Sequence, residues 1–204
     1  MSGRFVFIEG PDGVGKTTVT QALKEELDRS RQKFEFLSFP GKAAGTLGNL
    51  IYEIHHEPMK FGVAAMSGLS KQALHIAAHL DTIERIIDPI LTEGANIILD
   101  RYWWSTLVYG SVGGANQDAL LKLIEAEKTL WGSRKPALAI LLVRDAPIDR
   151  DEELSEWTKL RDAYRELAES ESAAYPVQII ENAASIDDAV SQIVSSIKSL
   201  IVAT

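Results

Sequence analysis

The sequence predicts an α/β fold in which helices cover both faces of a parallel β-sheet. Short apolar runs alternate with longer segments of helical periodicity, and a glycine-rich turn follows the first apolar run. The apolar runs contain little polar alternation, which is typical of parallel strands that are buried on both faces. Such alternation of strands and helices favours a three-layer architecture with right-handed crossovers.

Five strands are expected, each a short run rich in Val, Ile, Leu or Phe. They are Phe5–Glu9, Phe34–Ser38, Ala95–Asp100, Ala137–Val143 and Val177–Ile180. Ligands on parallel α/β sheets bind at the carboxyl ends of the strands. The residues that follow each run are therefore the first candidates for a functional site.

Helices are expected between the strands. They are Lys16–Arg29, Thr46–Ile54, Leu69–Thr92, Asn116–Leu130, Glu152–Ser170 and Ile186–Val202. Gly94 is well placed to end the long third helix, and Ser185 to cap the last one. A length of 204 residues, 46% of them hydrophobic, fits one domain over residues 1–204.

The composition excludes several classes of protein. The chain has no cysteine, which excludes a disulfide framework, a thiolate metal site and a cysteine nucleophile. The first strand begins close to the start, and no apolar stretch approaches the roughly 20 residues that span a bilayer, so we expect no signal peptide, no membrane association and a cytoplasmic location. A net charge of −8 argues against binding of duplex nucleic acid.

Residues 10–17, GPDGVGKT, match the phosphate-binding loop pattern G-x-x-x-x-G-K-[ST] between an expected strand and an expected helix. In that setting, backbone N–H groups and the helix N-terminus point at one position, where phosphate oxygens can bind. Lys16 can reach the β and γ phosphates, and the Thr17 hydroxyl can ligate Mg²⁺. The motif predicts an ATP and Mg²⁺ site.

Charged residues follow two other expected strands. Asp100 ends the third strand, where a carboxylate could organise Mg²⁺, although an Asp there is also a common turn former. Arg101 comes next, and Lys42 follows the second strand. Both cations could neutralise an acceptor phosphate, which phosphoryl transfer requires, while a lone lysine can equally be solvated.

Five segments in order along the chain resemble the thymidylate kinase family of nucleoside monophosphate kinases. They are FIEGPDGVGKTT at residues 7–18, SFPG at 38–41, IERIIDPILTEG, ILDRYWWSTLVYG at 98–110 and LRDAYRELAES. The resemblance implies a P-loop NTPase fold with strand order 2-3-1-4-5, and transfer of the ATP γ-phosphoryl group to a deoxynucleoside monophosphate. It also suggests a homodimer.

The resemblance assigns roles to individual residues. The ATP phosphates would bind the loop and the start of its helix, at Gly10, Gly13, Val14, Gly15, Lys16, Thr17 and Thr18. Asp12 would contact the acceptor sugar, and Arg101 would clamp the acceptor phosphate. The remaining acceptor residues would be Phe39, Pro40, Lys42, Tyr102, Ser105 and Tyr109, although the two tyrosines could instead be packing residues.

The base pocket departs from the family pattern. His75 and His79 stand where the family has a phenylalanine that stacks on the base and an arginine that hydrogen-bonds it. Residues four apart share a helix face, so both histidines should face the pocket. Core packing and a metal site are the alternatives, the latter without a carboxylate at matching spacing. Gly110 also stands where many bacterial members have glutamine.

The lid that covers ATP in the family is expected to be short here, at about residues 144–152. Arg144 and Arg150 are the cations able to act as lid arginines, and either could instead form a surface ion pair. If neither reaches the γ-phosphate, turnover should be slow.

Three functions remain open from the sequence. The first is a cytoplasmic kinase that phosphorylates dTMP or a related deoxypyrimidine monophosphate. The second is a kinase for a nucleoside or a hydroxymethylated pyrimidine nucleotide, suggested by His75 and His79. The third is a weakly active nucleotide-binding regulatory module, suggested by the short lid.

Overall fold

A single parallel sheet forms the centre of the molecule. The computed structural model describes residues 2–29, 33–148, 153–183 and 185–202, and its strand order is β2-β3-β1-β4-β5, which confirms the predicted order. The strands are β1 (Phe5–Glu9), β2 (Phe34–Ser38), β3 (Asn96–Asp100), β4 (Leu138–Val143) and β5 (Val177–Glu181). Their positions match the expected runs to within one residue at each end.

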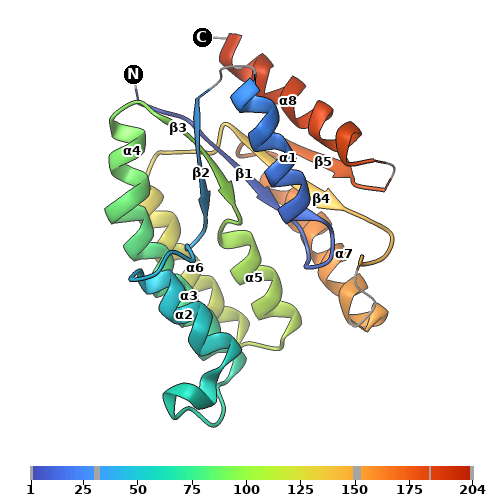
Figure 1. Ribbon diagram of the computed structural model, residues 1–204. Helices are drawn as coiled ribbons and strands as arrows, with labels where there is room; N and C mark the ends of the chain where they lie inside the picture. Colours follow the sequence, from blue (N-terminus) through green and yellow to red (C-terminus); the bar gives the residue numbers. More distant parts are fainter. Residues whose placement is uncertain (1, 30–32, 149–152, 184, 203–204) are drawn as a thin grey trace.

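Helices cover both faces of this sheet (Figure 1). They are α1 (Lys16–Arg29), α2 (Leu47–His56), α3 (Gly68–Thr82), α4 (Asp88–Thr92), α5 (Trp103–Val112), α6 (Gln117–Trp131), α7 (Leu154–Glu171) and α8 (Ile186–Val202). Helices α1 and α8 pack together on one face, while α3 to α7 lie on the other. Helix α2 packs on α3 beyond the sheet. None of the helices in the described ranges is long and apolar enough to cross a membrane.

Side-chain alternation along the central strand divides the core in two. Val6 and Ile8 pack in the cluster that includes residues of α1 and α8. Phe5 and Phe7 point the other way, into an aromatic cluster that includes Trp131. All five residues of β1 are buried. The sheet is thus covered on both faces, as the continuous apolar runs predict.

Two helical segments differ from the expectation. The long third helix is divided by a π-helical turn, Ile83–Ile87, between α3 and α4. Helix α5 was not predicted, because Trp103, Trp104, Val108 and other residues on several of its sides are buried between α3, α6 and α7. A helix that is buried nearly all round lacks the one-sided apolar stripe that identifies a helix in a sequence.

The carboxyl ends of β1, β2 and β3 meet at one edge of the sheet. Ile8 and Ser38 both lie beside Asp100 in the strand register. The backbone continues this pairing past the strands: the N–H of Phe39 donates to the Asp100 carbonyl at 2.9 Å, and that of Arg101 to the Ile8 carbonyl at 3.0 Å. The glycine loop, Phe39 and Arg101 are therefore brought to the same place.

Candidate active site

The glycine loop between β1 and α1 packs against the residues that follow β4 and β5. Gly13 and Gly15 have φ angles of 74° and 91°, which favour glycine. A Cβ on Gly15 would lie 2.6 Å from Nδ2 of Asn182, which donates to the Val14 carbonyl at 2.8 Å. A Cβ on Gly13 would lie 2.9 Å from Cβ of Pro147. The loop shape is therefore set by the chain after β4 and β5 as well as by its own glycines.

Lys16 lies across the mouth of this loop. Its Nζ donates to the carbonyls of Gly10 at 2.7 Å and Pro11 at 2.9 Å, and its side chain is 7% exposed. Burial, with a further contribution from Arg101, lowers the pKa of Lys16 to about 8. Thr17 and Thr18 follow at the exposed start of α1. The ammonium group is thus placed where a bound phosphate would replace the carbonyls.

Arg101 and Asp12 join the end of β3 to the glycine loop. The Arg101 guanidinium pairs with Asp12 Oδ1 and donates to Ser105 Oγ at 2.8 Å. Burial opposes ionisation of Asp12, but Arg101 and Lys16 outweigh it, so the pKa of Asp12 is lowered. The Asp12 N–H donates to the Tyr109 hydroxyl at 3.0 Å. Two residues 89 positions apart therefore form one charged pair at the loop.

Glu9 is a central residue that the sequence reasoning missed. It is fully buried and accepts hydrogen bonds from the N–H groups of Tyr102 at 2.8 Å and Ser105 at 3.0 Å. The Ser105 hydroxyl and the Tyr164 hydroxyl also donate to its carboxyl group, at 2.8 and 3.1 Å. Burial raises the pKa of Glu9 although Arg101 opposes this. The sequence did contain a signal for Glu9: it is an acidic residue at the end of an apolar strand, the same feature that identified Asp100 as a candidate.

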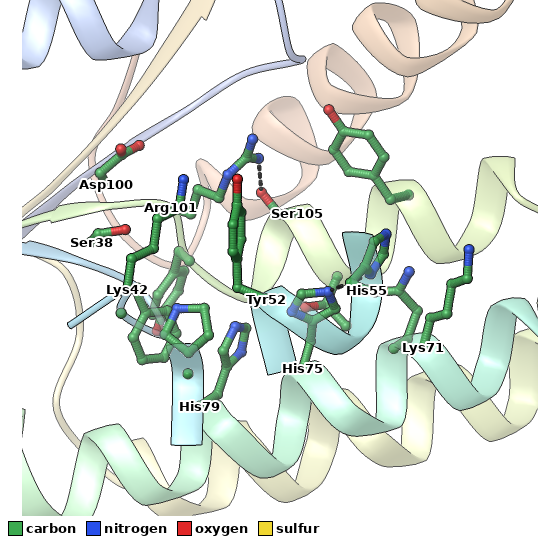
Figure 2. Close-up of a pocket in the computed structure, with 18 of the residues that line it drawn as sticks. Ser38, Lys42, Tyr52, His55, Lys71, His75, His79, Asp100, Arg101 and Ser105 are labelled. Atoms are coloured by element: carbon green, nitrogen blue, oxygen red, sulfur yellow. Dashed lines mark hydrogen bonds between the residues drawn. The ribbon is translucent and has the colours of Figure 1, made fainter. Parts of the chain in front are cut away.

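A cavity of about 730 Å³ opens beside this charged pair. It lies between the ends of β2 and β3 and helices α2, α3 and α5 (Figure 2). All the residues predicted for the acceptor line it: Asp12, Phe39, Pro40, Lys42, His75, His79, Arg101, Tyr102, Ser105 and Tyr109. The cavity therefore adjoins the glycine loop through Asp12 and Arg101.

The two histidines of α3 both line the cavity, and each has a partner. Nδ1 of His79 lies 2.6 Å from Glu127 Oε2, and its ring stacks on Phe39 with centroids 4.1 Å apart. Nε2 of His75 lies 3.1 Å from Nδ1 of His55 in α2. Burial, with the neighbouring His79, lowers the pKa of His75 to about 3, so this imidazole is neutral.

Two other predicted acceptor residues, Tyr102 and Lys42, contact aromatic side chains of the protein. The Tyr102 ring stacks on Phe7 with centroids 4.5 Å apart and is 3% exposed, so its aromatic face belongs mainly to the core. Lys42 is exposed, and its Nζ lies 4.5 Å from the centroid of the Tyr52 ring, a cation–π contact. Tyr109, by contrast, faces Asp12 through its hydroxyl.

The residues present fit a magnesium ion. Asp100 Oδ1 is shielded from solvent and has no hydrogen-bond partner among the described residues, which suits a carboxylate that orients a metal-bound water. Thr17 places its hydroxyl at the start of α1. The described ranges contain no group of three or more His, Asp or Glu side chains able to hold a metal, so a metal site built on His75 and His79 lacks a third such ligand.

Comparison with known proteins identifies the family. The model of the family described as thymidylate kinase matches residues 8–193. The chain belongs to the thymidylate kinase family. Thymidylate kinases are nucleoside monophosphate kinases, which are phosphotransferases.

Individual thymidylate kinases agree with this assignment. The enzyme of Rhodopseudomonas palustris strain BisB18 is 30% identical, covering 83% of this chain and 78% of its own. The probable thymidylate kinase of Pyrococcus horikoshii is 30% identical over 97% of each chain. The crystal structure of thymidylate kinase from Ehrlichia chaffeensis has the same fold, with a TM-score of 0.74, 18% identity and coverage of 97% of this chain and 100% of its own.

The described residues of the expected lid in this thymidylate kinase family member, 144–148, do not line the cavity. Arg144 does not line the cavity, and its guanidinium donates to the Asn182 carbonyl at the end of β5. The N–H of Ile148 donates to the Gly13 carbonyl at 2.8 Å, so the chain after β4 contacts the glycine loop directly. Arg150 lies outside the described residues.

Gly110 has a packing explanation. A Cβ there would lie 2.7 Å from Leu120 Cδ2 and 3.1 Å from Gln72 Cγ, because α3, α5 and α6 approach closely. Gln72 itself lines the cavity and is 8% exposed, and its side chain has no hydrogen bond to the described part of the chain. The sequence reasoning missed Gln72. A polar residue on the same helix face as His75 and His79 was the signal.

Proposed function

We propose that this protein transfers the γ-phosphoryl group of ATP to dTMP, with Mg²⁺ as the metal. The main support for this proposal is the Asp12–Arg101 ion pair, because it lies between the phosphate-binding loop and the acceptor cavity. Phosphoryl transfer requires the donor and acceptor phosphates to meet with their charge neutralised. A cation between the two sites meets that requirement.

The surrounding residues suit the parts of this reaction. Lys16 and the N–H groups of the glycine loop would hold the ATP phosphates. Arg101 would exchange Asp12 for the acceptor phosphate, which frees the Asp12 carboxylate to accept a hydrogen bond from the acceptor sugar. Glu9 would keep Ser105, and through it Arg101, in place. When bound, Mg²⁺ would supply further charge neutralisation, with Thr17 and Asp100 holding it and its waters.

We further propose a single catalytic domain that acts as a homodimer in the cytoplasm. The family resemblance supports the dimer, and a chain without cysteine suits a reducing compartment. The comparisons favour neither the nucleoside or hydroxymethylated acceptor nor the regulatory module.

A coupled assay of ADP release across dTMP, dUMP, dCMP, dGMP and thymidine tests the proposal. We expect turnover that depends on dTMP and is lost in Lys16→Ala, because the loop would no longer neutralise the ATP phosphates. Lys24→Ala is the matched control, since Lys24 is exposed on the same helix. Absence of turnover with every monophosphate would refute the kinase assignment, and a preference for thymidine would favour the nucleoside alternative.

A further inference from the structure

Glu127 is a fully buried carboxylate in α6 that the proposed mechanism does not use. Its carboxyl group lies 2.6 Å from Nδ1 of His79 and accepts a hydrogen bond from Nε1–H of Trp131 at 3.2 Å. A buried carboxyl group that stays ionised requires a compensating positive charge. The 2.6 Å contact has the short length of a charge-assisted hydrogen bond, which points to a protonated His79 as that charge.

The orientation of His79 leaves one nitrogen for a ligand. Nδ1 faces Glu127 and the ring plane stacks on Phe39, so Nε2 is the remaining polar atom of the ring. Nε2 has no hydrogen bond to any residue that the structure describes, although His79 is 3% exposed and lines the cavity. Figure 2 shows His79 beside His75 on the cavity side of α3.

Glu127 is the acidic side chain in contact with His79. The other titratable or charged groups that line this cavity come from α2, α3, α5 and the loops after β1, β2 and β3. They are Asp12, Lys42, Tyr52, His55, His56, Lys71, His75, Asp100, Arg101, Tyr102 and Tyr109. The neighbouring imidazole of His75 is neutral, so it adds no repulsion to a charged His79.

We propose that Glu127 is a positioning residue that keeps a proton on both nitrogens of His79, so that Nε2–H donates a hydrogen bond to the 4-oxo group of the acceptor pyrimidine. This inference rests on the proposed function. A 4-oxo pyrimidine such as dTMP or dUMP presents an acceptor at that position, whereas the 4-amino group of dCMP presents N–H donors. If dCMP bound, its 4-amino N–H donors would face the Nε2–H donor of His79. Neither group would then have an acceptor, and leaving a buried donor unpaired costs binding free energy.

Gln72 does not provide this discrimination, although its side chain is buried at this wall and has no hydrogen bond to another described residue. An amide carries both a donor and an acceptor and can turn to suit either base. A doubly protonated imidazole carries donors alone. The selectivity for the 4-oxo group therefore belongs to His79 and, through it, to Glu127.

The ring protonation is measurable in the wild-type protein by ¹⁵N NMR of histidine-labelled samples at pH 7. The chain has four histidines, and His79→Phe assigns the signal of His79. We expect both ring nitrogens of His79 to be protonated, and one of them to lose its proton in Glu127→Gln. A singly protonated His79 in the wild type would overturn the proposal without any variant of Glu127.

The selectivity is tested by the ratio of kcat/KM for dUMP to that for dCMP. We expect Glu127→Gln to lower this ratio about tenfold, because it removes the charge on the donor. Glu125→Gln is the matched control, since Glu125 is exposed on the same helix. An unchanged ratio in Glu127→Gln overturns the inference, while absence of turnover with all acceptors in the wild type overturns the proposed function instead.

Discussion

At the residue scale, the site depends on Arg101 being held in an unfavourable backbone conformation. Its φ of 81° lies in the left-handed region, which a non-glycine residue rarely adopts. The ion pair with Asp12 and the hydrogen bond to Ser105 hold its guanidinium between the loop and the cavity. Such conformations persist where surrounding contacts determine them, often at functional sites.

Arg101→Ala should abolish most of the turnover while leaving ATP binding by the loop. An arginine at the transferring phosphoryl group is worth about 10³-fold or more in kcat, so we expect a loss of that order. Arg85→Ala, a change of a well-exposed arginine, should retain full activity. Steady-state kinetics with saturating ATP measure both, and a loss below tenfold for Arg101→Ala would place Arg101 outside the reaction.

Glu9→Gln should destabilise the fold as well as the site. All four groups that contact the Glu9 carboxyl from Tyr102, Ser105 and Tyr164 donate hydrogen bonds, so an amide N–H₂ would face donors. We expect a loss of about 1–3 kcal/mol in the free energy of unfolding, measured in urea. Glu166→Gln, on an exposed part of α7, is the control and should be neutral. Equal stability of the two variants would contradict this account of Glu9.

ATP affinity should decrease as the pH rises past about 8. The pKa of Lys16 in the free protein is about 8, so the ammonium group that binds phosphate is largely charged at pH 7 and largely neutral at pH 9. Because ATP binding requires the charged form, we expect about tenfold weaker binding at pH 9 than at pH 7. Calorimetric titration at both values measures it, and equal affinities would show that Lys16 does not titrate in this range.

At the element scale, the strands and most helices were predictable because each has a local signature. The buried parallel strands are continuous apolar runs, and α1 follows a recognisable phosphate loop. Helix α5 was not predictable from periodicity, because it is buried on several sides. The partners of His75 and His79 were also not predictable, since His55 and Glu127 come from other helices and local spacing carries no information about such contacts.

The close packing of α5 on α6 gives a test at this scale. Gly110→Ala should destabilise the protein by about 1–3 kcal/mol, because the new Cβ would lie 2.7 Å from Leu120. The double variant Gly110→Ala/Leu120→Ala should recover part of the cost of Gly110→Ala in a double-mutant cycle. Gly68→Ala is the control, since the nearest atom to its Cβ would be 3.4 Å away. Urea unfolding measures the free energy of unfolding of each variant. If the effects of the changes at residues 110 and 120 on this free energy were additive, the close contact would be contradicted.

At the scale of the whole molecule, the strand order determines which loops meet. Strand β1 lies between β3 and β4, so the loop after β1 faces the end of β3 on one side and the chain after β4 on the other. Arg101 therefore reaches Asp12, and Ile148 contacts Gly13. The sequence motifs identify both loops, and the parallel sheet brings them into contact.

Transfer of radioactive phosphate from [γ-³²P]ATP to dTMP shows whether the two sites act together, because it follows the phosphoryl group itself. If the phosphate loop and the cavity beside Arg101 form one active site, the label will appear in dTDP in proportion to the ADP released. Label that appears in inorganic phosphate alone, at a rate independent of dTMP, would contradict a shared site.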